Sequence, residues 1–294
     1  MFEGYKKDKQ RINGIDISYR IGGHGPALLL LHGHPQTHTI WHKVADTLAE
    51  HFTVIAADLR GYGDSSKPSA SQNHVAHSNR VMAQDMVDLM KSLGLEKFSI
   101  LAHDRGARVS HRLAMDHPNL VERMTLLDIA PTLSMYTQTN EEFARAYWHW
   151  FFLIRPAPLP EALIESDPEL YLRSVMGSRS SSMSPFTDEA FGEYLRCLRQ
   201  PGSATGICED YRASATIDLE HDRADIKEGR KLSCPLLVMW GDEGTVGRCF
   251  KPLDEWRQVA DQVQGKPLPA GHYIAEEVPE QLLAELLPFF NVEC

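Results

Sequence analysis

The stretch Ile100-Leu-Ala-His-Asp-Arg-Gly106 decides the fold of this 294-residue chain. It links a β-favouring run, Phe98–Ala102, to a helical pattern over Val109–His117. A small residue two positions before and a glycine two positions after a central residue, between a strand and a helix, form the pattern of a nucleophile elbow. The central residue is Asp104. A carboxylate there is suited to displacing a leaving group from an sp³ carbon, which leaves a stable ester. The simpler alternative is an aspartate that only caps the helix.

Strand and helix patterns alternate outward from the elbow in both directions. The short β-rich runs end at turns that contain Gly, Asp or His, and the helical patterns place their apolar residues on one face. Such alternation predicts an α/β fold with a mostly parallel sheet flanked by helices. The other expected strands are Ile15–Arg20, Ala27–Leu31, Phe52–Ala57, Met124–Asp128 and Cys234–Trp240, and the other expected helices are Arg80–Leu93 and Pro279–Phe290.

The segment from about residue 132 to residue 230 has a different composition. It is dense in aromatic residues around Tyr147–Phe152, is broken by prolines and contains the serine-rich piece Ser178–Ser184. We interpret it as a helical cap inserted over the carboxyl edge of the sheet, where open α/β folds bind ligands. The expected organisation is a hydrolase core at 1–131, a cap at 132–230 and the rest of the core at 231–294.

Composition and charge exclude several classes of protein. Hydrophobic residues make up 43% and charged residues 24%, as in an ordinary globular protein. The formal charge is −10, from 30 Lys and Arg against 40 Asp and Glu, which disfavours nucleic-acid and anionic membrane partners. The five cysteines are widely spaced and match neither a disulfide framework nor a zinc pattern. With no apolar run of membrane-spanning length and no signal-peptide pattern, we expect a cytoplasmic location.

Hydrolysis of an ester on Asp104 requires a general base and a residue that orients it. His272, in the loop Pro269–Tyr273 before the last helical pattern, is the candidate base. The order nucleophile, acid, histidine along the chain is that of α/β hydrolases. Two aspartates that follow strands compete for the role of orienting acid, Asp128 and Asp242. We favour Asp128.

The turn His32-Gly33-His34-Pro35 follows an apolar strand, and we expect its backbone N–H groups to face the elbow. Its backbone N–H groups, that of His34 among them, would form an oxyanion hole with the N–H of Arg105. The histidines at 32, 34, 38 and 42 also allow a metal site, but no cysteine or carboxylate ligand accompanies them. We therefore expect neither a metal nor a cofactor.

Arg105 and Arg108 indicate the substrate class. Arg105 follows the nucleophile directly, and Arg108 lies one helical turn further on. A guanidinium group binds a carboxylate through two parallel hydrogen bonds, and the start of a helix already favours anions. The two arginines therefore predict a small anionic substrate, unless they only pair with carboxylates of the protein.

At this point the sequence resembles a known branch of the α/β-hydrolase superfamily, the haloalkane dehalogenases and epoxide hydrolases. The motifs that carry this likeness are His32–Pro35, Asp58–Ser66, His103–Gly106 and Ala270–His272. Within that branch the chain is similar to fluoroacetate (haloacetate) dehalogenases over essentially its whole length. The more specific motifs are His103–Arg108, Tyr147–Trp150 and Cys208–Arg212.

The resemblance implies an α/β-hydrolase fold with a helical cap, and a cofactor-free conversion of haloacetate, including fluoroacetate, to glycolate and halide. Asp104 would displace the halide, Arg105 and Arg108 would bind the substrate carboxylate, and His272 with Asp128 would activate water. The family's halide-binding positions correspond to His149, Trp150 and Tyr211. Members are typically homodimers.

An epoxide hydrolase is the nearest alternative, since it uses the same ester chemistry. It would need tyrosines above the nucleophile as acids, and Tyr147 and Tyr211 keep this possibility open, while the two arginines count against it. Neutral haloalkanes are disfavoured, because haloalkane dehalogenases have tryptophan where Arg105 stands. A binding protein of the same fold would lack a catalytic member, whereas all three are present.

Overall fold

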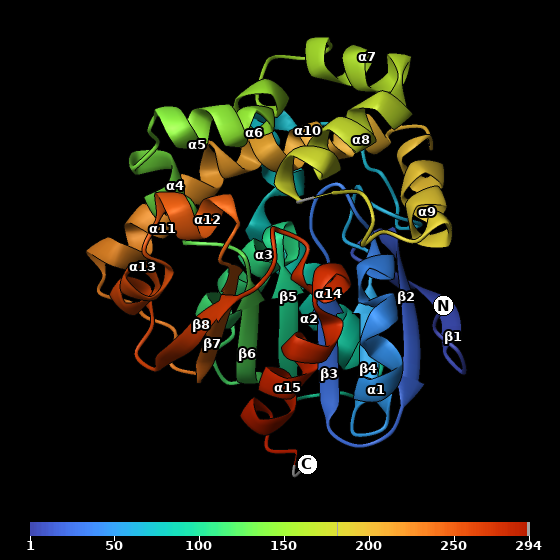
Figure 1. Cartoon of the computed structure of the whole chain (residues 1–294), viewed down its shortest axis with the longest axis vertical. Helices are drawn as coiled ribbons and strands as arrows, with labels where there is room; N and C mark the ends of the chain where they lie inside the picture. Colours follow the sequence, from blue (N-terminus) through green and yellow to red (C-terminus); the bar gives the residue numbers. More distant parts are fainter. Residues whose placement is uncertain (181, 293–294) are drawn as a thin grey trace.

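One sheet of eight strands organises the structure, a computed structural model that describes residues 1–180 and 182–292. The strand order is β1-β2-β4-β3-β5-β6-β7-β8, as Figure 1 shows. Pairing is parallel from β4 through β8 and antiparallel where β2 meets β1 and β4. The strands are β1 Lys6–Ile12, β2 Ile15–Gly23, β3 Ala27–Leu31, β4 Thr53–Ala57, β5 Phe98–His103, β6 Val121–Leu127, β7 Leu236–Gly241 and β8 Val263–Leu268.

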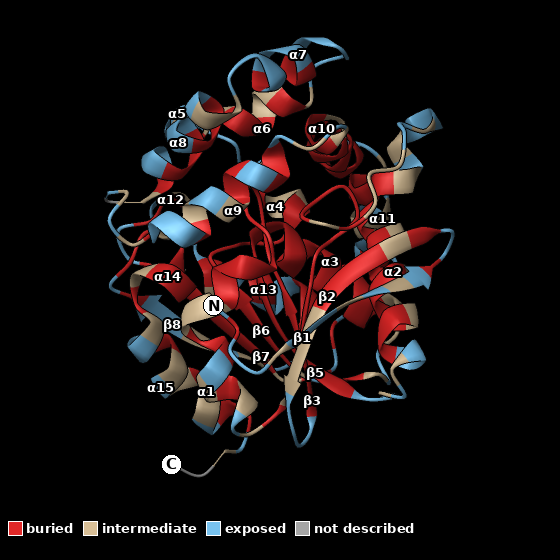
Figure 2. Cartoon of the chain, turned by 90° about the vertical axis from the view of Figure 1, so that its right-hand side faces the viewer, coloured by how far each residue is buried: buried red, intermediate tan, exposed pale blue. Residues whose placement is uncertain are grey.

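Helices cover both faces of the sheet because the buried strands are apolar on both sides. In β3, Leu28 and Leu30 pack in one core cluster with α1 and α15, while Leu29 and Leu31 pack in the other with α2 and α3. Figure 2 shows these central strands buried. The core helices are α1 Ala45–Ala49, α2 Asn79–Ser92, α3 Asp104–Asp116, α12 Thr245–Cys249, α13 Pro252–Val259, α14 Ile274–Glu277 and α15 Pro279–Phe289, with 3-10 turns η1 His38–Lys43 and η2 Gln72–His77.

Further helices lie between β6 and β7 in sequence and gather above one edge of the sheet in Figure 1. This is the carboxyl edge, because Arg105, just after β5, bonds to Asp210 in this segment. The helices are α4 Thr132–Thr137, α5 Glu141–Ala146, α6 Trp148–Leu153, α7 Leu159–Ser166, α8 Pro168–Arg179, α9 Asp188–Leu198, α10 Ser203–Ser214 and α11 Ile217–Lys227. They occupy the segment for which the sequence predicts a cap.

The predicted α/β fold with a mostly parallel sheet is confirmed, with three local differences. The helix expected from Val109 begins at Asp104 itself. The strands β1 and β8 were not predicted. Both are edge strands with a largely polar or exposed face, so they lack the apolar run that marks a buried strand. Of the residues noted in the sequence, Ser181 and Cys294 lie outside the described part.

The elbow between β5 and α3 requires a glycine at 106. The N–H of Gly106 donates to the carbonyl of His32 over 2.8 Å. A side-chain carbon at Gly106 would overlap the carbonyl oxygens of Leu31 and His32. Asp104 itself has φ 45°, a left-handed conformation that costs roughly 1–3 kcal/mol in a residue other than glycine. The close approach of two backbones therefore fixes where the carboxylate of Asp104 stands.

Gly106→Ala is expected to lower the free energy of unfolding by about 1–3 kcal/mol, because the added methyl group must push β3 and α3 apart. The measurement is urea denaturation followed by circular dichroism. Gly192→Ala in α9 is the matched control: nothing lies within 4 Å of its added carbon, and alanine favours a helix. Equal stability of the two variants would contradict this account of the elbow.

Candidate active site

Asp104, His272 and Asp128 come together at the carboxyl edge of the sheet. Asp104 opens α3, Asp128 directly follows β6, and His272 lies in the loop between β8 and α14. Nδ1 of His272 lies 2.6 Å from Oδ2 of Asp128, and Nε2 lies 3.4 Å from Oδ2 of Asp104. A carboxylate only accepts hydrogen bonds, so Nδ1 carries the proton and Nε2 faces the nucleophile with its lone pair.

The structure distinguishes the two aspartates that compete for the orienting position. Asp128 is buried, and its second oxygen accepts the N–H of Gly241 over 3.1 Å. Asp242 lies exposed on the surface. The loop that carries His272 is itself held, because the carbonyl of His272 contacts the ring of His103 at 2.8 Å. Geometry therefore places Asp128, and not Asp242, against the imidazole.

Asp104 is held as a carboxylate. Burial alone would raise its pKa, but the adjacent imidazole of His272 and the charge of Arg179 hold the pKa of Asp104 well below its usual range. The side chain is 1% exposed. An ionised, dehydrated carboxylate beside a base is a competent nucleophile.

The turn at residues 32–35 packs against the elbow. A side-chain carbon at Gly33 would overlap Cβ of Asp104 and would lie 3.1 Å from the backbone nitrogen of Arg105. This puts the turn beside the N–H for which the sequence predicts one half of an oxyanion hole. The part assigned to the N–H of His34 stays a prediction. The His34 ring is buried and its Nε2 contacts the hydroxyl of Tyr171 at 3.0 Å.

Arg105 is buried and already paired with a carboxylate of the protein. Its Nε donates to Oδ2 of Asp210 over 2.9 Å, and its Nη2 bonds to Oδ1 of the same residue and to Oγ of Ser214. The guanidinium also lies over the ring of Tyr211, 4.6 Å from its centroid. Within the described chain, Nη1 is the nitrogen without a partner. Asp210 therefore balances the charge of Arg105 and leaves one donor nitrogen for a substrate.

Arg108 has neutral partners. Its Nη1 donates to Oγ1 of Thr132 over 2.9 Å and to the carbonyl of Ala130 over 3.3 Å. The guanidinium lies 4.7 Å from the centroid of the Trp150 ring. Burial and the nearby Arg105 lower the pKa of Arg108, although an arginine stays charged at neutral pH. Among the described residues, no carboxylate pairs with Arg108, so its buried charge is available to an anion.

The three predicted halide-binding residues form one buried cluster on two cap helices. His149 and Trp150 lie on α6 and Tyr211 on α10, each at most 1% exposed. The Tyr211 ring centroid lies 6.0 Å from that of His149 and 6.2 Å from that of Trp150. Both ring nitrogens of His149, Nε1 of Trp150 and the hydroxyl of Tyr211 have no hydrogen-bond partner among the described residues. Because buried polar groups are normally bonded, these clustered atoms are available to a ligand.

Arg179 is a site residue that the sequence analysis missed. It ends α8, is 5% exposed, and places Nη1 2.9 Å from Nε2 of His272 and 3.3 Å from Oδ2 of Asp104. Its Nη2 donates to the carbonyl of His34 over 2.7 Å. In the sequence it stands in a serine-rich piece of the cap without any motif. Asp210 was also missed, although it lies inside the motif Cys208–Arg212.

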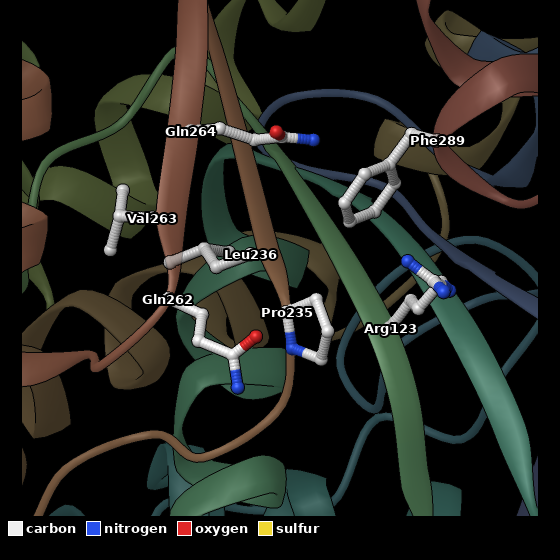
Figure 3. Close-up of a pocket in the computed structure, with 7 residues that line it drawn as sticks. All are labelled: Arg123, Pro235, Leu236, Gln262, Val263, Gln264 and Phe289. Atoms are coloured by element: carbon white, nitrogen blue, oxygen red, sulfur yellow. The ribbon is translucent and has the colours of Figure 1, made fainter.

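Other features do not contribute to this site. The depression in Figure 3, about 420 Å³, lies where β7 and β8 begin, at the opposite edge of the sheet from Asp104. No group of three or more His, Cys, Asp or Glu residues in the described ranges is arranged to hold a metal ion. None of the helices described combines the length and apolar character that a bilayer crossing requires.

Comparison with known proteins places the chain among relatives that share its full length. A fluoroacetate dehalogenase from Burkholderia sp is 41% identical over 292 residues, covering 99% of this chain and 95% of the relative. A soluble epoxide hydrolase from Corynebacterium sp. (strain C12) is 36% identical over 286 residues, 95% of each chain. The solved structure of an alpha/beta hydrolase from Nostoc sp PCC 7120 is 51% identical, with a TM-score of 0.97 and full coverage of both chains. The alpha/beta hydrolase fold family itself matches residues 26–279. The chain therefore belongs to the alpha/beta hydrolase family.

Proposed function

We propose that this hydrolase removes halide from a 2-haloacetate, fluoroacetate included, and yields glycolate without a cofactor. The observation that carries the proposal is that α3 presents both an ionised carboxylate, Asp104, and a buried guanidinium, Arg108, that lacks a carboxylate partner among the described residues. Such an arrangement suits a substrate that carries both a leaving group and a negative charge. The 41% identity with a fluoroacetate dehalogenase supports it. The homodimer and the cytoplasmic location expected from the sequence remain predictions.

The first step forms an ester. An Oδ atom of Asp104 attacks the carbon that bears the halogen, a C–O bond forms, and the C–X bond breaks with its electron pair leaving on the halide. The unpaired donors of His149, Trp150 and Tyr211 would solvate the departing halide. Fluoride is a poor leaving group unless donors stabilise its charge in a dry site.

The second step hydrolyses that ester. A water oxygen attacks the carbonyl carbon of Asp104 while its proton moves to Nε2 of His272. Asp128, 2.6 Å from Nδ1, stabilises the imidazolium that forms. The tetrahedral intermediate then breaks: the glycolate oxygen takes the proton from His272, and the second proton of the water leaves to solvent, which restores the carboxylate of Asp104.

An epoxide hydrolase is the second candidate. The unpaired hydroxyl of Tyr211 is a buried acid that would protonate an epoxide oxygen, and burial raises its pKa well above the usual value. The 36% identity with a soluble epoxide hydrolase supports this reading. The buried charge of Arg108 counts against it, because a neutral epoxide offers that charge no partner.

Halide release from chloroacetate and fluoroacetate, measured beside diol formation from styrene oxide, separates the two functions. We expect halide from both acids and no diol, since the buried cations favour a carboxylate substrate. Asp104→Asn is the control and is expected to abolish release. Diol formation without halide release would overturn the dehalogenase proposal in favour of the epoxide hydrolase.

Asp128→Asn is expected to slow ester hydrolysis by on the order of 10²-fold or more, because the imidazolium loses its counter-charge. The ester on Asp104 should then accumulate and be visible as a carboxymethylated protein by mass spectrometry. Asp242→Asn, at the exposed competing position, should turn over normally. Loss of turnover in the Asp242 variant alone would reassign the orienting acid.

Arg108→Leu is expected to raise KM for chloroacetate about 10- to 100-fold, since a charge-assisted hydrogen bond contributes roughly 1.5–3 kcal/mol. Steady-state kinetics provides the measurement. Arg145→Leu, which removes an exposed arginine of α5, is the control for a general loss of charge. An unchanged KM in the Arg108 variant would exclude that residue from carboxylate binding.

A further inference from the structure

Arg179 lies between the nucleophile and the base. Its Nη1 contacts both Oδ2 of Asp104, at 3.3 Å, and Nε2 of His272, at 2.9 Å. These are the two atoms on which the proposed reaction depends, because Asp104 must attack carbon and His272 must take a proton from water. While the guanidinium contacts both, the lone pair of Nε2 is occupied and an adjacent cation weakens the Asp104 carboxylate as a nucleophile. The side chain of Arg179 must therefore move before Nε2 can take a proton from water, and its departure from Asp104 makes that carboxylate a stronger nucleophile.

The helix that carries Arg179 is anchored independently of that contact. The hydroxyl of Tyr171, on the same helix α8, contacts Nε2 of His34 at 3.0 Å. The Arg179 guanidinium also lies 5.2 Å from the ring centroid of Tyr273 and 6.0 Å from that of Tyr147. These aromatic faces favour a cation in the site after it leaves Asp104. The required change is thus a rearrangement of one long side chain rather than of the cap.

A buried cation does not leave its anion without compensation. Asp104 is the carboxylate within salt-bridge distance of Arg179 among the described residues. Parting a buried ion pair without a new partner leaves two uncompensated charges, which is strongly unfavourable. Arg105 differs, because Asp210 already balances its charge.

We propose that Arg179 determines specificity for anionic substrates. The guanidinium of Arg179 moves from Asp104 to pair with the carboxylate of the substrate. This movement frees the nucleophile, Asp104, and the base, His272, together. A neutral substrate offers no such exchange, so Arg179 stays paired with Asp104 and on Nε2 of His272. This proposal rests on the proposed function and extends it by naming the group that rejects neutral molecules.

The test compares chloroacetate with its neutral amide, chloroacetamide, which has the same leaving group and nearly the same size. The measured quantity is the ratio of their kcat/KM values for halide release, after subtraction of the Asp104→Asn background. Both substrates report on the same folded enzyme, so the ratio does not depend on the fraction that folds.

Arg179→Met should lower the ratio of chloroacetate to chloroacetamide at least about tenfold, the size of effect that a charge-assisted hydrogen bond produces. Arg179→Lys, which keeps the charge, should retain a ratio closer to that of the wild type. Arg173→Met removes an exposed arginine of the same helix and should leave the ratio unchanged.

A wild-type ratio in Arg179→Met would overturn the proposal for Arg179 and leave the proposed function standing. A reduced ratio that Arg179→Lys fails to restore in any part would also overturn it, because the charge would then not be the cause. No halide release from either substrate by the wild type would overturn the proposed function, and the role of Arg179 with it.

Discussion

The approach of Gly106 to the backbone of Leu31 and His32 is the contact on which the site depends. It presses the start of α3 against the end of β3 and leaves no room for a side chain. Asp104 is thereby pushed above the sheet, and the arginines of the first turns of α3 are directed beneath the cap. The turn at 32–35 reaches the backbone of Arg105 through the same contact. One hydrogen-bonded crossing of two backbones thus positions Asp104, the proposed nucleophile, and part of its surroundings.

Local pairing, rather than net charge, governs the electrostatics of this site. The chain carries a formal charge of −10, yet three buried arginines lie close to Asp104. Their situations differ: Arg105 is balanced by Asp210, Arg179 contacts the nucleophile, and Arg108 has only neutral partners. In a low-dielectric interior, the existing partners of each guanidinium decide whether it can bind an incoming carboxylate.

The sequence predicts best what is encoded locally. The elbow around Asp104 and the position of His272 follow from residues adjacent in the chain, and most strands follow from apolar runs. The sequence alone cannot distinguish Asp128 from Asp242, because both follow a strand. The structure distinguishes them, because Asp128 lies against His272. Arg179 was beyond prediction, since folding alone brings the end of α8 to a carboxylate 75 positions away. The edge strands β1 and β8 were not predicted, because their polar residues lack the pattern of a buried strand.

Asp104 and Asp128 share an unusual backbone conformation. Both have positive φ, 45° and 49°, where glycine would be relaxed and an aspartate is strained. Glycine at either position would relieve this strain and so favour the stability of the fold. Each aspartate is retained against that tendency, as expected where activity and stability conflict. Of the seven described residues other than glycine with positive φ, Asp104 and Asp128 are the two whose carboxylates lie against His272.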